Sequence, residues 1–215
     1  MTLKIHGIAA SRAIRPLWAA AELGLVFEHH AKSFKDGGTR TPEFLAINPN
    51  GHIPVLEDVR DEGTVVVWES MACVLYLVRL HGRADGHSLT PASAHEEADA
   101  LRWSFWTVTE LEKDALIVLM HRMAMPADQR KPDLAEAAEK RLMVPLKVLE
   151  AHLEKQVAKG QPFLAAERFT VADLCVASVV TWARPAPGLL SQFPAVHVWL
   201  EQCLSRPAYL QARKA

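Results

Sequence analysis

One turn-rich segment constrains the fold of this chain more than any other part of it: Asn48-Pro49-Asn50-Gly51-His52-Ile53-Pro54-Val55-Leu56, followed by an apolar run and then Glu69-Ser70. The Asn-Pro-Asn-Gly run predicts a turn, and the residues after Pro54 predict a short strand. A second strand around Val66 leads to Glu69-Ser70, where we expect a helix to begin. An X-Pro bond is the one peptide bond whose cis form costs little, and we expect Ile53–Pro54 to be cis.

This arrangement predicts a binding edge for a peptide. A proline at the first position of a strand leaves the backbone of the preceding residue, Ile53, outside its own sheet and free for a ligand. The helix that begins at Ser70 would present unpaired N–H groups beside that edge. An extended peptide with a free carboxylate fits both features.

The order of elements up to residue 82 predicts a small mixed sheet with helices on both faces. We expect strands at Leu3–Gly7 and Val26–His30, with a helix over Arg12–Leu23 between them. A short helix over Pro42–Ile47, the two strands around Val55 and Val66, and a helix over Ser70–Leu80 follow. This βαβ, α, ββα order is thioredoxin-like. The polar stretch His81–Pro91 predicts a linker, which places one domain at residues 1–82 and a second at 92–215.

The second domain is expected to be all-helical, because its apolar residues recur at helical spacing. Helices are predicted over Ala92–Arg122 and Asp133–Ala158, and Thr170-Val171-Ala172-Asp173 is typical of a capping box that begins another helix. In the first of these helices, the predicted core stripe consists of Leu101, Phe105, Val108 and Ala115. A neighbouring face, expected to meet the other domain or a ligand, carries Asp99, Trp103, Trp106 and Glu110.

Composition and charge exclude several classes of function. The 24 basic and 25 acidic residues nearly cancel, so we expect no nucleic-acid partner. No apolar run is long enough to cross a bilayer and the first residues lack the pattern of a signal peptide, so we expect no membrane association and a cytoplasmic location. Cys73, Cys175 and Cys203 lie far apart in apolar segments, and reduced core thiols are expected. The pair His29-His30 lacks metal-ligand spacing, and no metal is expected.

Asn-Pro-x-Gly-x-Ile-Pro-x-Leu followed by Glu-Ser resembles the glutathione transferase family. Further segments agree with that family over essentially the whole chain: Ser11-Arg12-Ala13-Ile14-Arg15, Phe169-Thr170-Val171-Ala172-Asp173, Phe193-Pro194-Ala195-Val196 and Arg206-Pro207-Ala208. The resemblance implies an α/β thioredoxin-like N-terminal domain and an all-α C-terminal domain. It also implies glutathione as co-substrate, a small electrophile as second substrate, and a homodimer with its active site near the subunit interface.

The resemblance implies that Ser11 is the catalytic residue, because serine-type members place their serine four residues before an arginine, as in Ser11 and Arg15. Its hydroxyl would donate to the glutathione thiolate, and the first helix would add positive potential. Ser11 can equally be read as a helix N-cap. Tyrosine-type members carry their tyrosine near the end of the first strand, where this chain has His6; the histidine is expected to pack in the sheet rather than to act as a base.

The same resemblance assigns the glutathione-binding residues. Ser70 and the helix behind it would bind the γ-glutamyl carboxylate, and Glu69 its α-amino group, although a simple helix cap also explains this pair. The backbone of Ile53, held by Pro54, would pair with the cysteinyl unit. Arg40 and His52 would bind the glycine carboxylate, with Lys35 a weaker candidate; Arg40 could also be a solvated loop charge.

The electrophile is expected to lie against Trp103, Trp106 and Glu110, although these residues could instead pack against the first domain. Conjugation of glutathione to a small electrophile, as in detoxification, is therefore the predicted function. Two alternatives remain: another glutathione-dependent reaction, such as dehalogenation, isomerisation or peroxide reduction, and a non-catalytic binding protein with the same fold.

Overall fold

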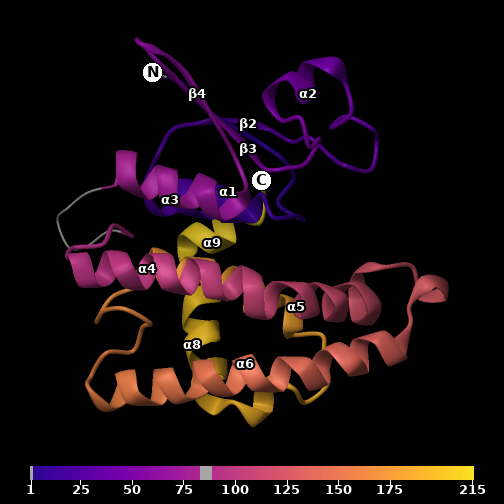
Figure 1. Ribbon diagram of the computed structural model, residues 1–215, viewed down its shortest axis with the longest axis vertical. Coiled ribbons are helices and arrows are strands. Elements are labelled where there is room, and N and C mark those ends of the chain that lie inside the picture. The colour runs from indigo at the N-terminus through magenta and orange to yellow at the C-terminus, as the bar shows by residue number, and fades with distance from the viewer. Residues whose placement is uncertain (1, 83–88) are drawn as a thin grey trace. The chain divides into compact units, whose positions relative to one another are not determined.

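The computed structural model describes residues 2–82 and 89–215, and the chain divides into two compact units (Figure 1). One unit consists of Met1–Thr90 together with Arg206–Ala215, and the other of Pro91–Ser205. The last ten residues of the chain therefore group with the N-terminal unit. The linker predicted at His81–Pro91 includes residues 83–88, which lie outside the described residues.

A mixed sheet of four strands forms the centre of the first unit in the part of the chain that the structure describes. The strands follow the order β2-β1-β3-β4: β1 is Thr2–His6, β2 is Glu28–His30, β3 is Val55–Arg60 and β4 is Gly63–Trp68. β1 pairs in parallel with β2, and β3 is antiparallel to both β1 and β4. The register sets Ile5 opposite His29 and Leu56, and it sets His6 opposite His30 and Val55.

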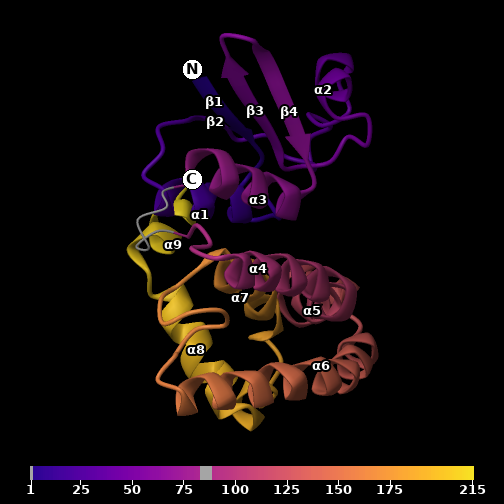
Figure 2. The ribbon, with the colours of Figure 1, turned by 60° about the vertical axis from the view of Figure 1, so that its left-hand side comes forward.

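Helices cover both faces of this sheet, as predicted. In both views α1 (Ile14–Glu22) and α3 (Ser70–His81) lie on one face, whereas α2 (Pro42–Ile47) lies on the other (Figures 1 and 2). The core between the sheet and α1 and α3 consists of fully buried apolar side chains, among them Ile5, Leu17, Leu56 and Leu77. α2 begins at Pro42 because the side chain of Thr41 accepts a hydrogen bond from the Phe44 N–H.

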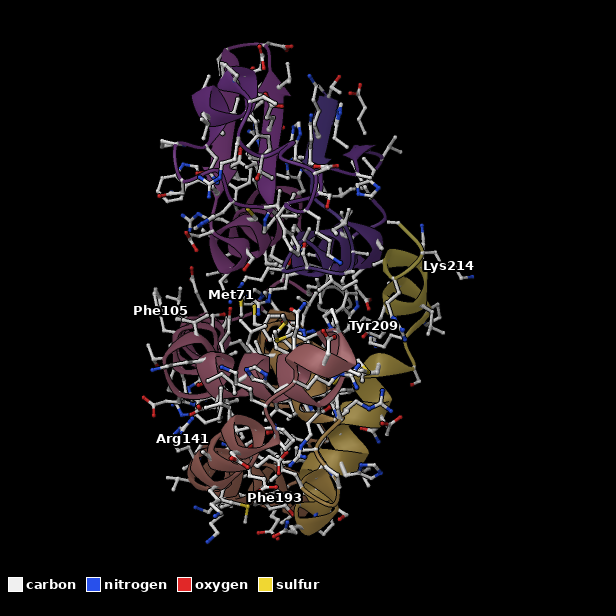
Figure 3. All side chains as sticks on the ribbon, turned by 90° about the vertical axis from the view of Figure 1, so that its right-hand side faces the viewer. Met71, Phe105, Arg141, Phe193, Tyr209 and Lys214 are labelled. Carbon is white, nitrogen blue, oxygen red and sulfur yellow. The ribbon has the colours of Figure 1, made fainter. Side chains whose placement is uncertain are left out.

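The C-terminal helix α9 (Pro207–Ala212) completes the first unit. Arg206 donates two hydrogen bonds, of 2.6 and 2.7 Å, to the carboxylate of Glu22 at the end of α1. The ring centroids of Tyr209, which is labelled in Figure 3, and Trp18 lie 4.7 Å apart. A bidentate ion pair and an aromatic contact thus hold α9 against α1.

The second unit is helical. Its α-helices are α4 (Ala94–Trp106), α5 (Glu112–Leu119), α6 (Pro132–Ala158), α7 (Val171–Val180) and α8 (Pro194–Leu204). π-helical turns follow α4 at Thr107–Leu111 and α5 at Met120–Ala124, and short 3-10 segments occur at Ala127–Gln129, Thr181–Ala183 and Leu190–Gln192. Among the described residues, no helix combines the length and the apolar character that crossing a membrane requires.

The predicted capping box at Thr170 is confirmed, and its acidic residue has a wider role. Asp173 is fully buried and accepts hydrogen bonds from the N–H and the hydroxyl of Thr170, at 2.9 and 3.0 Å. The N–H of Leu164 and the indole N–H of Trp199 also donate to it, each at 2.9 Å. One carboxylate therefore joins the start of α7 to the preceding loop and to α8.

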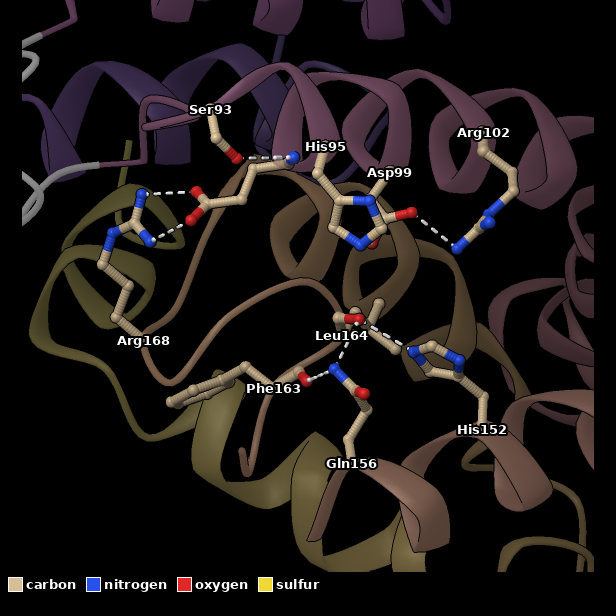
Figure 4. A network of polar contacts seen from close by, with 10 residues as sticks. Ser93, His95, Asp99, Arg102, His152, Gln156, Phe163, Leu164 and Arg168 are labelled. Atoms are coloured by element: carbon tan, nitrogen blue, oxygen red, sulfur yellow. Dashed lines mark hydrogen bonds and ion pairs between the residues drawn. The ribbon is translucent and has the colours of Figure 1, made fainter. Parts of the chain in front are cut away.

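The loop before α7 is fixed by further polar contacts, shown in Figure 4. From α6, His152 contacts the carbonyl of Leu164 at 2.8 Å, and Gln156 donates to the same carbonyl at 3.2 Å. Arg168 donates to both carboxylate oxygens of Glu96 in the first turn of α4. Because these contacts come from α4 and α6, the loop is part of the framework of the helical unit.

The predicted core stripe on the first long helix is wrong. Leu101, Phe105 and Val108 are 44%, 65% and 37% exposed, and only Ala115 of the predicted stripe is buried. Figure 3 shows Phe105 at the edge of the helical unit. The buried residues of α4 and the π-helical turn after it are instead Asp99, Ala100, Trp103, Ser104, Thr107 and Leu111. Small and polar side chains such as Ala100 and Ser104 share this face with Trp103 and Leu111, so the spacing of the apolar residues does not identify it.

All three cysteines are fully buried thiols outside any disulfide, as predicted. Burial raises the pKa of Cys73 to about 12, and the nearby Glu69 carboxylate adds to this effect. Cys73 therefore stays protonated at neutral pH and is unsuited to be a nucleophile.

Candidate functional site

The candidate site is built around Gly7, the residue that follows β1. Its φ of +134° lies in a region that favours glycine. A Cβ atom at this position would lie 2.6 Å from the Cβ of Ala13 and 3.1 Å from that of Ile53. The absence of a side chain at Gly7 thus lets the turn that contains Ser11 lie against the loop that contains Ile53 and Pro54.

Ser11 lies in the turn between β1 and α1. Its hydroxyl donates to the carbonyl of Ile8 at 2.7 Å and accepts the N–H of Ala13 at 3.1 Å. The second contact satisfies the N–H of Ala13, which is the N-cap residue of α1, so Ser11 stabilises the turn just before the helix. To donate to a thiolate, the hydroxyl would exchange its contact with Ile8 for one with the sulfur.

His6 is buried on the opposite face of the sheet from α1 and is held by other residues of that face. Its Nε2 lies 2.7 Å from a carboxylate oxygen of Glu57, and its ring stacks on that of His30 with centroids 4.6 Å apart. Burial lowers the pKa of His6, although the hydrogen bond to Glu57 opposes that effect. Packing in the sheet, as expected from the sequence, describes its environment.

The Ile53–Pro54 bond is cis, as predicted. The preceding loop is organised by Asn48, a buried residue whose side chain donates to the carbonyl of His52 at 2.8 Å and accepts the N–H of Asn50 at 3.1 Å. The His52 side chain is exposed beside this loop. Arg40 is also exposed, and it donates to the carbonyl of Asn50 at 3.2 Å. The two basic residues assigned to the glycine carboxylate therefore flank the same loop.

Glu69 and Ser70 form the N-terminus of α3. Glu69 has a φ of +71°, which is unusual for a residue with a side chain, and it makes no side-chain capping bond to the helix. The first turn of α3 contains no acidic residue, so its partial positive charge is not neutralised locally. The buried Ser70 hydroxyl accepts a hydrogen bond of 2.7 Å from Arg15 of α1, whose side chain is also buried.

The residues expected to line the acceptor site belong to the helical unit. Trp103 is buried and its ring lies 4.9 Å from that of Trp106 and 4.8 Å from that of His152. Trp106 is half-buried and Glu110 is exposed. The contacts among these rings describe packing within the unit, and their role toward an electrophile stays a prediction.

Sequence reasoning missed several residues that organise the first unit: Arg15, Asn48, His29 and Glu57. Arg15 is the one with a readable signal, because an arginine within an otherwise apolar helix predicts a buried polar partner. His29 and Glu57 act through contacts between distant segments, which one sequence does not reveal. Asn48 acts within its own loop, through the contacts with His52 and Asn50.

The first unit is thioredoxin-like, with an open helix N-terminus beside a cis-proline loop, and a helical unit follows it in the sequence. This combination is that of the two-domain glutathione transferase class. Two family models match the chain: the N-terminal domain of glutathione S-transferase over residues 1–79 and its C-terminal domain over residues 113–207. The chain belongs to the glutathione S-transferase family, and the predicted fold class is confirmed.

Particular relatives support this membership. Glutathione S-transferase 3 of Zea mays is 32% identical over 216 residues, which cover 96% of this chain and 91% of the relative. The disulfide-bond oxidoreductase YfcG of Escherichia coli is 33% identical over 82% of this chain and 78% of its own length. A theta class glutathione S-transferase from Xanthomonas axonopodis pv. citri, solved with glutathione bound, is 27% identical with a TM-score of 0.85, covering 100% of this chain and 98% of that one.

Proposed function

We propose that this protein is an enzyme that binds glutathione and transfers its thiolate to the carbon of a small electrophile. The N-terminus of α3 is the observation that carries the proposal. It combines uncapped N–H groups, the Ser70 hydroxyl and the strained backbone of Glu69 at one point. Backbone strain in a residue whose side chain does not cap its helix is typical of a ligand-binding position.

Each part of glutathione finds a chemical counterpart in the first unit. The γ-glutamyl carboxylate accepts hydrogen bonds from Ser70 and the first N–H groups of α3, and Glu69 binds the α-amino group. The backbone of Ile53, next to Pro54, pairs with the cysteinyl unit. Arg40 and His52, on either side of the cis-proline loop, bind the glycine carboxylate. A bound ligand of this kind is consistent with the glutathione held by the Xanthomonas relative.

In the proposed reaction the bound thiol first loses its proton to solvent, and the Ser11 hydroxyl and the dipole of α1 stabilise the resulting thiolate. The sulfur lone pair then forms a C–S bond with the electrophile. In a substitution the leaving group departs with its bonding electron pair, and in an addition the carbon skeleton takes up a proton. Trp103, Trp106 and Glu110 are proposed to line the acceptor side.

Binding of glutathione by matched variants tests the proposal. Glu69→Gln and Ser70→Ala should each lower glutathione affinity about ten- to a hundredfold, because charge-assisted hydrogen bonds are worth about 1.5–3 kcal/mol. Glu62→Gln, in the exposed turn between β3 and β4, is the control and should bind as the wild type does. Calorimetric titration measures all three, and full affinity in both site variants would contradict the proposed site.

One relative, the disulfide-bond oxidoreductase YfcG, is the reason to test a second reaction, the reduction of disulfides. Reduction of a disulfide by glutathione would use the same binding residues, and the buried cysteines of this chain would take no part. A substrate panel of aryl halides, activated alkenes, peroxides and small disulfides separates the two reactions. Glutathione binding without turnover of any of these would support a non-catalytic binding protein instead.

We also propose a cytoplasmic location and a homodimer. An exposed apolar stripe supports the homodimer: Leu101 and Phe105 of α4, with Val108 of the π-helical turn after it. Three apolar side chains on one face of a helix favour contact with another protein surface over water. Phe105→Lys should shift the protein from dimer to monomer in sedimentation velocity. Val198→Lys, at an exposed apolar position of α8, is the matched control and should leave the dimer intact.

A further inference from the structure

His29 makes a contact that its position in the sequence does not predict. Its Nε2 lies 2.8 Å from the carbonyl oxygen of Gly7, and its side chain is half-buried. Because a carbonyl oxygen only accepts, Nε2 carries the proton and donates it. The adjacent His30 projects from the other face of β2 and stacks on His6, so the two histidines have separate environments.

This contact fixes one peptide plane just beyond the end of β1. The N–H of Gly7 donates to the carbonyl of His30 at 2.9 Å, and the carbonyl of Gly7 accepts from His29. Both polar groups of Gly7 are therefore bonded to β2. A glycine has more backbone freedom than any other residue, so these two bonds restrict a position that would otherwise be mobile.

The next carbonyl along the chain is the one that Ser11 uses. The Gly7 oxygen belongs to the Gly7–Ile8 peptide, and the Ile8 carbonyl accepts the Ser11 hydroxyl at 2.7 Å. A rotation of the Gly7–Ile8 plane would displace the Ile8 carbonyl and the turn that presents Ser11.

We propose that His29 is a positioning residue for Ser11: by donating to the Gly7 carbonyl it holds the turn so that the Ser11 hydroxyl faces the thiol of bound glutathione. This inference rests on the proposed function of Ser11. His29 touches neither glutathione nor the reacting atoms; it acts through two peptide units.

The test is the pH titration of the thiolate absorbance of the protein saturated with glutathione. His29→Phe should raise the pKa of the bound thiol and lower the thiolate fraction at neutral pH by about three- to tenfold, since one pKa unit is a factor of ten. Glutathione affinity should change less, because its charged ends are bound elsewhere. His197→Phe, at an exposed position of α8, is the control.

Two variants with an amide side chain, His29→Gln and His29→Asn, separate the loss of the hydrogen bond from the loss of the imidazole ring. The side-chain nitrogen of glutamine can take the place of Nε2, whereas that of asparagine is too short to reach the Gly7 carbonyl. His29→Gln should restore the wild-type titration, and His29→Asn should behave as His29→Phe does. Equal titrations of the two amide variants would overturn the proposal, whatever happens to stability.

A double variant separates this inference from the proposed function. Ser11→Ala combined with His29→Phe should titrate as Ser11→Ala alone, because His29 then has no hydroxyl to position. Additive effects, or an unchanged titration in His29→Phe, would overturn the positioning role while leaving Ser11 as the catalytic residue. An unchanged titration in Ser11→Ala would overturn the role of Ser11, and with it that of His29.

Discussion

Arg15 donates a 2.7 Å hydrogen bond to the hydroxyl of Ser70, and both side chains are buried between α1 and α3. The bond orients a hydroxyl at the N-terminus of α3, where an anionic ligand is proposed to bind. It also occupies one lone pair of the Ser70 oxygen, so the hydroxyl proton is directed toward another acceptor. Arg15 thereby links the helix that follows Ser11 to the one that follows Glu69.

Arg15→Met is expected to weaken glutathione binding by about tenfold and to lower the free energy of unfolding by about 1.5–3 kcal/mol, the usual worth of a hydrogen bond to a charged group. Adding Ser70→Ala should weaken binding by less than the product of the two single effects, because both variants remove the same bond. Calorimetry and chemical denaturation measure these quantities. Strictly additive binding losses would show that Arg15 and Ser70 act independently.

Glu69→Gly should raise the stability of the protein and weaken its binding of glutathione. Glycine adopts a φ of +71° without steric cost, and relief of a strained backbone is worth about 1–3 kcal/mol, less the greater entropy of glycine in the unfolded chain. We expect a higher melting temperature together with weaker glutathione binding. Glu69→Gln keeps the side-chain volume and should leave the melting temperature unchanged. A glycine variant that is less stable than the wild type would contradict the account of strain at Glu69.

Much of the fold was predictable because local signals and long-range structure agree. Pro42 and Thr41 define the start of α2, Thr170 and Asp173 define that of α7, and the alternation of elements gave the mixed sheet. The helical spacing of apolar residues predicted the helical second unit, and the family resemblance agreed with it. Element ends were predicted less well: the helix expected from Arg12 begins at Ile14, and the strand expected from Val26 begins at Glu28.

The failures have a common physical cause. Leu101, Phe105 and Val108 are apolar and regularly spaced, but they are exposed. The spacing of apolar residues does not distinguish a helix face that packs in the core from one that lies on the surface. In the candidate site, Arg15 and His29 act on residues far from them in the sequence. Such contacts depend on how α1 packs against α3 and how β1 pairs with β2, and a single sequence does not show which elements pack together.

Asp173→Ala should destabilise the helical unit by at least about 3 kcal/mol, since it leaves several buried donors without their acceptor. Thr170→Ala removes only part of the cap and should cost about 0.5–2 kcal/mol. Thermal unfolding measures the difference between them. Turnover per folded molecule should stay at the wild-type value, and a catalytic defect at normal stability would contradict the structural role of Asp173.

The lowered pKa of His6 predicts a pH dependence of stability. Burial disfavours the charged form in the folded protein, so the unfolded chain takes up this proton at a higher pH than the folded chain does. The contribution of His6 is therefore present above the unfolded pKa of about 6.5 and is lost as the pH falls below it. Denaturation at pH 7.5 and 5.5 should give a smaller loss of stability in His6→Phe than in the wild type. An equal or larger loss in the variant would contradict a neutral, buried His6.

Ser11 is proposed to stabilise the thiolate of bound glutathione. The thiolate absorbance of the binary complex, titrated against pH, tests this role most directly. A free thiol has a pKa of about 8.5. In the wild-type complex the pKa should lie below that value, and in Ser11→Ala it should rise toward it while remaining partly lowered by α1. Ser11→Thr keeps a hydroxyl and should titrate close to the wild type. Superimposable curves for the wild type and Ser11→Ala, with full turnover in both, would contradict this role and leave Ser11 with only its structural contacts in the turn before α1.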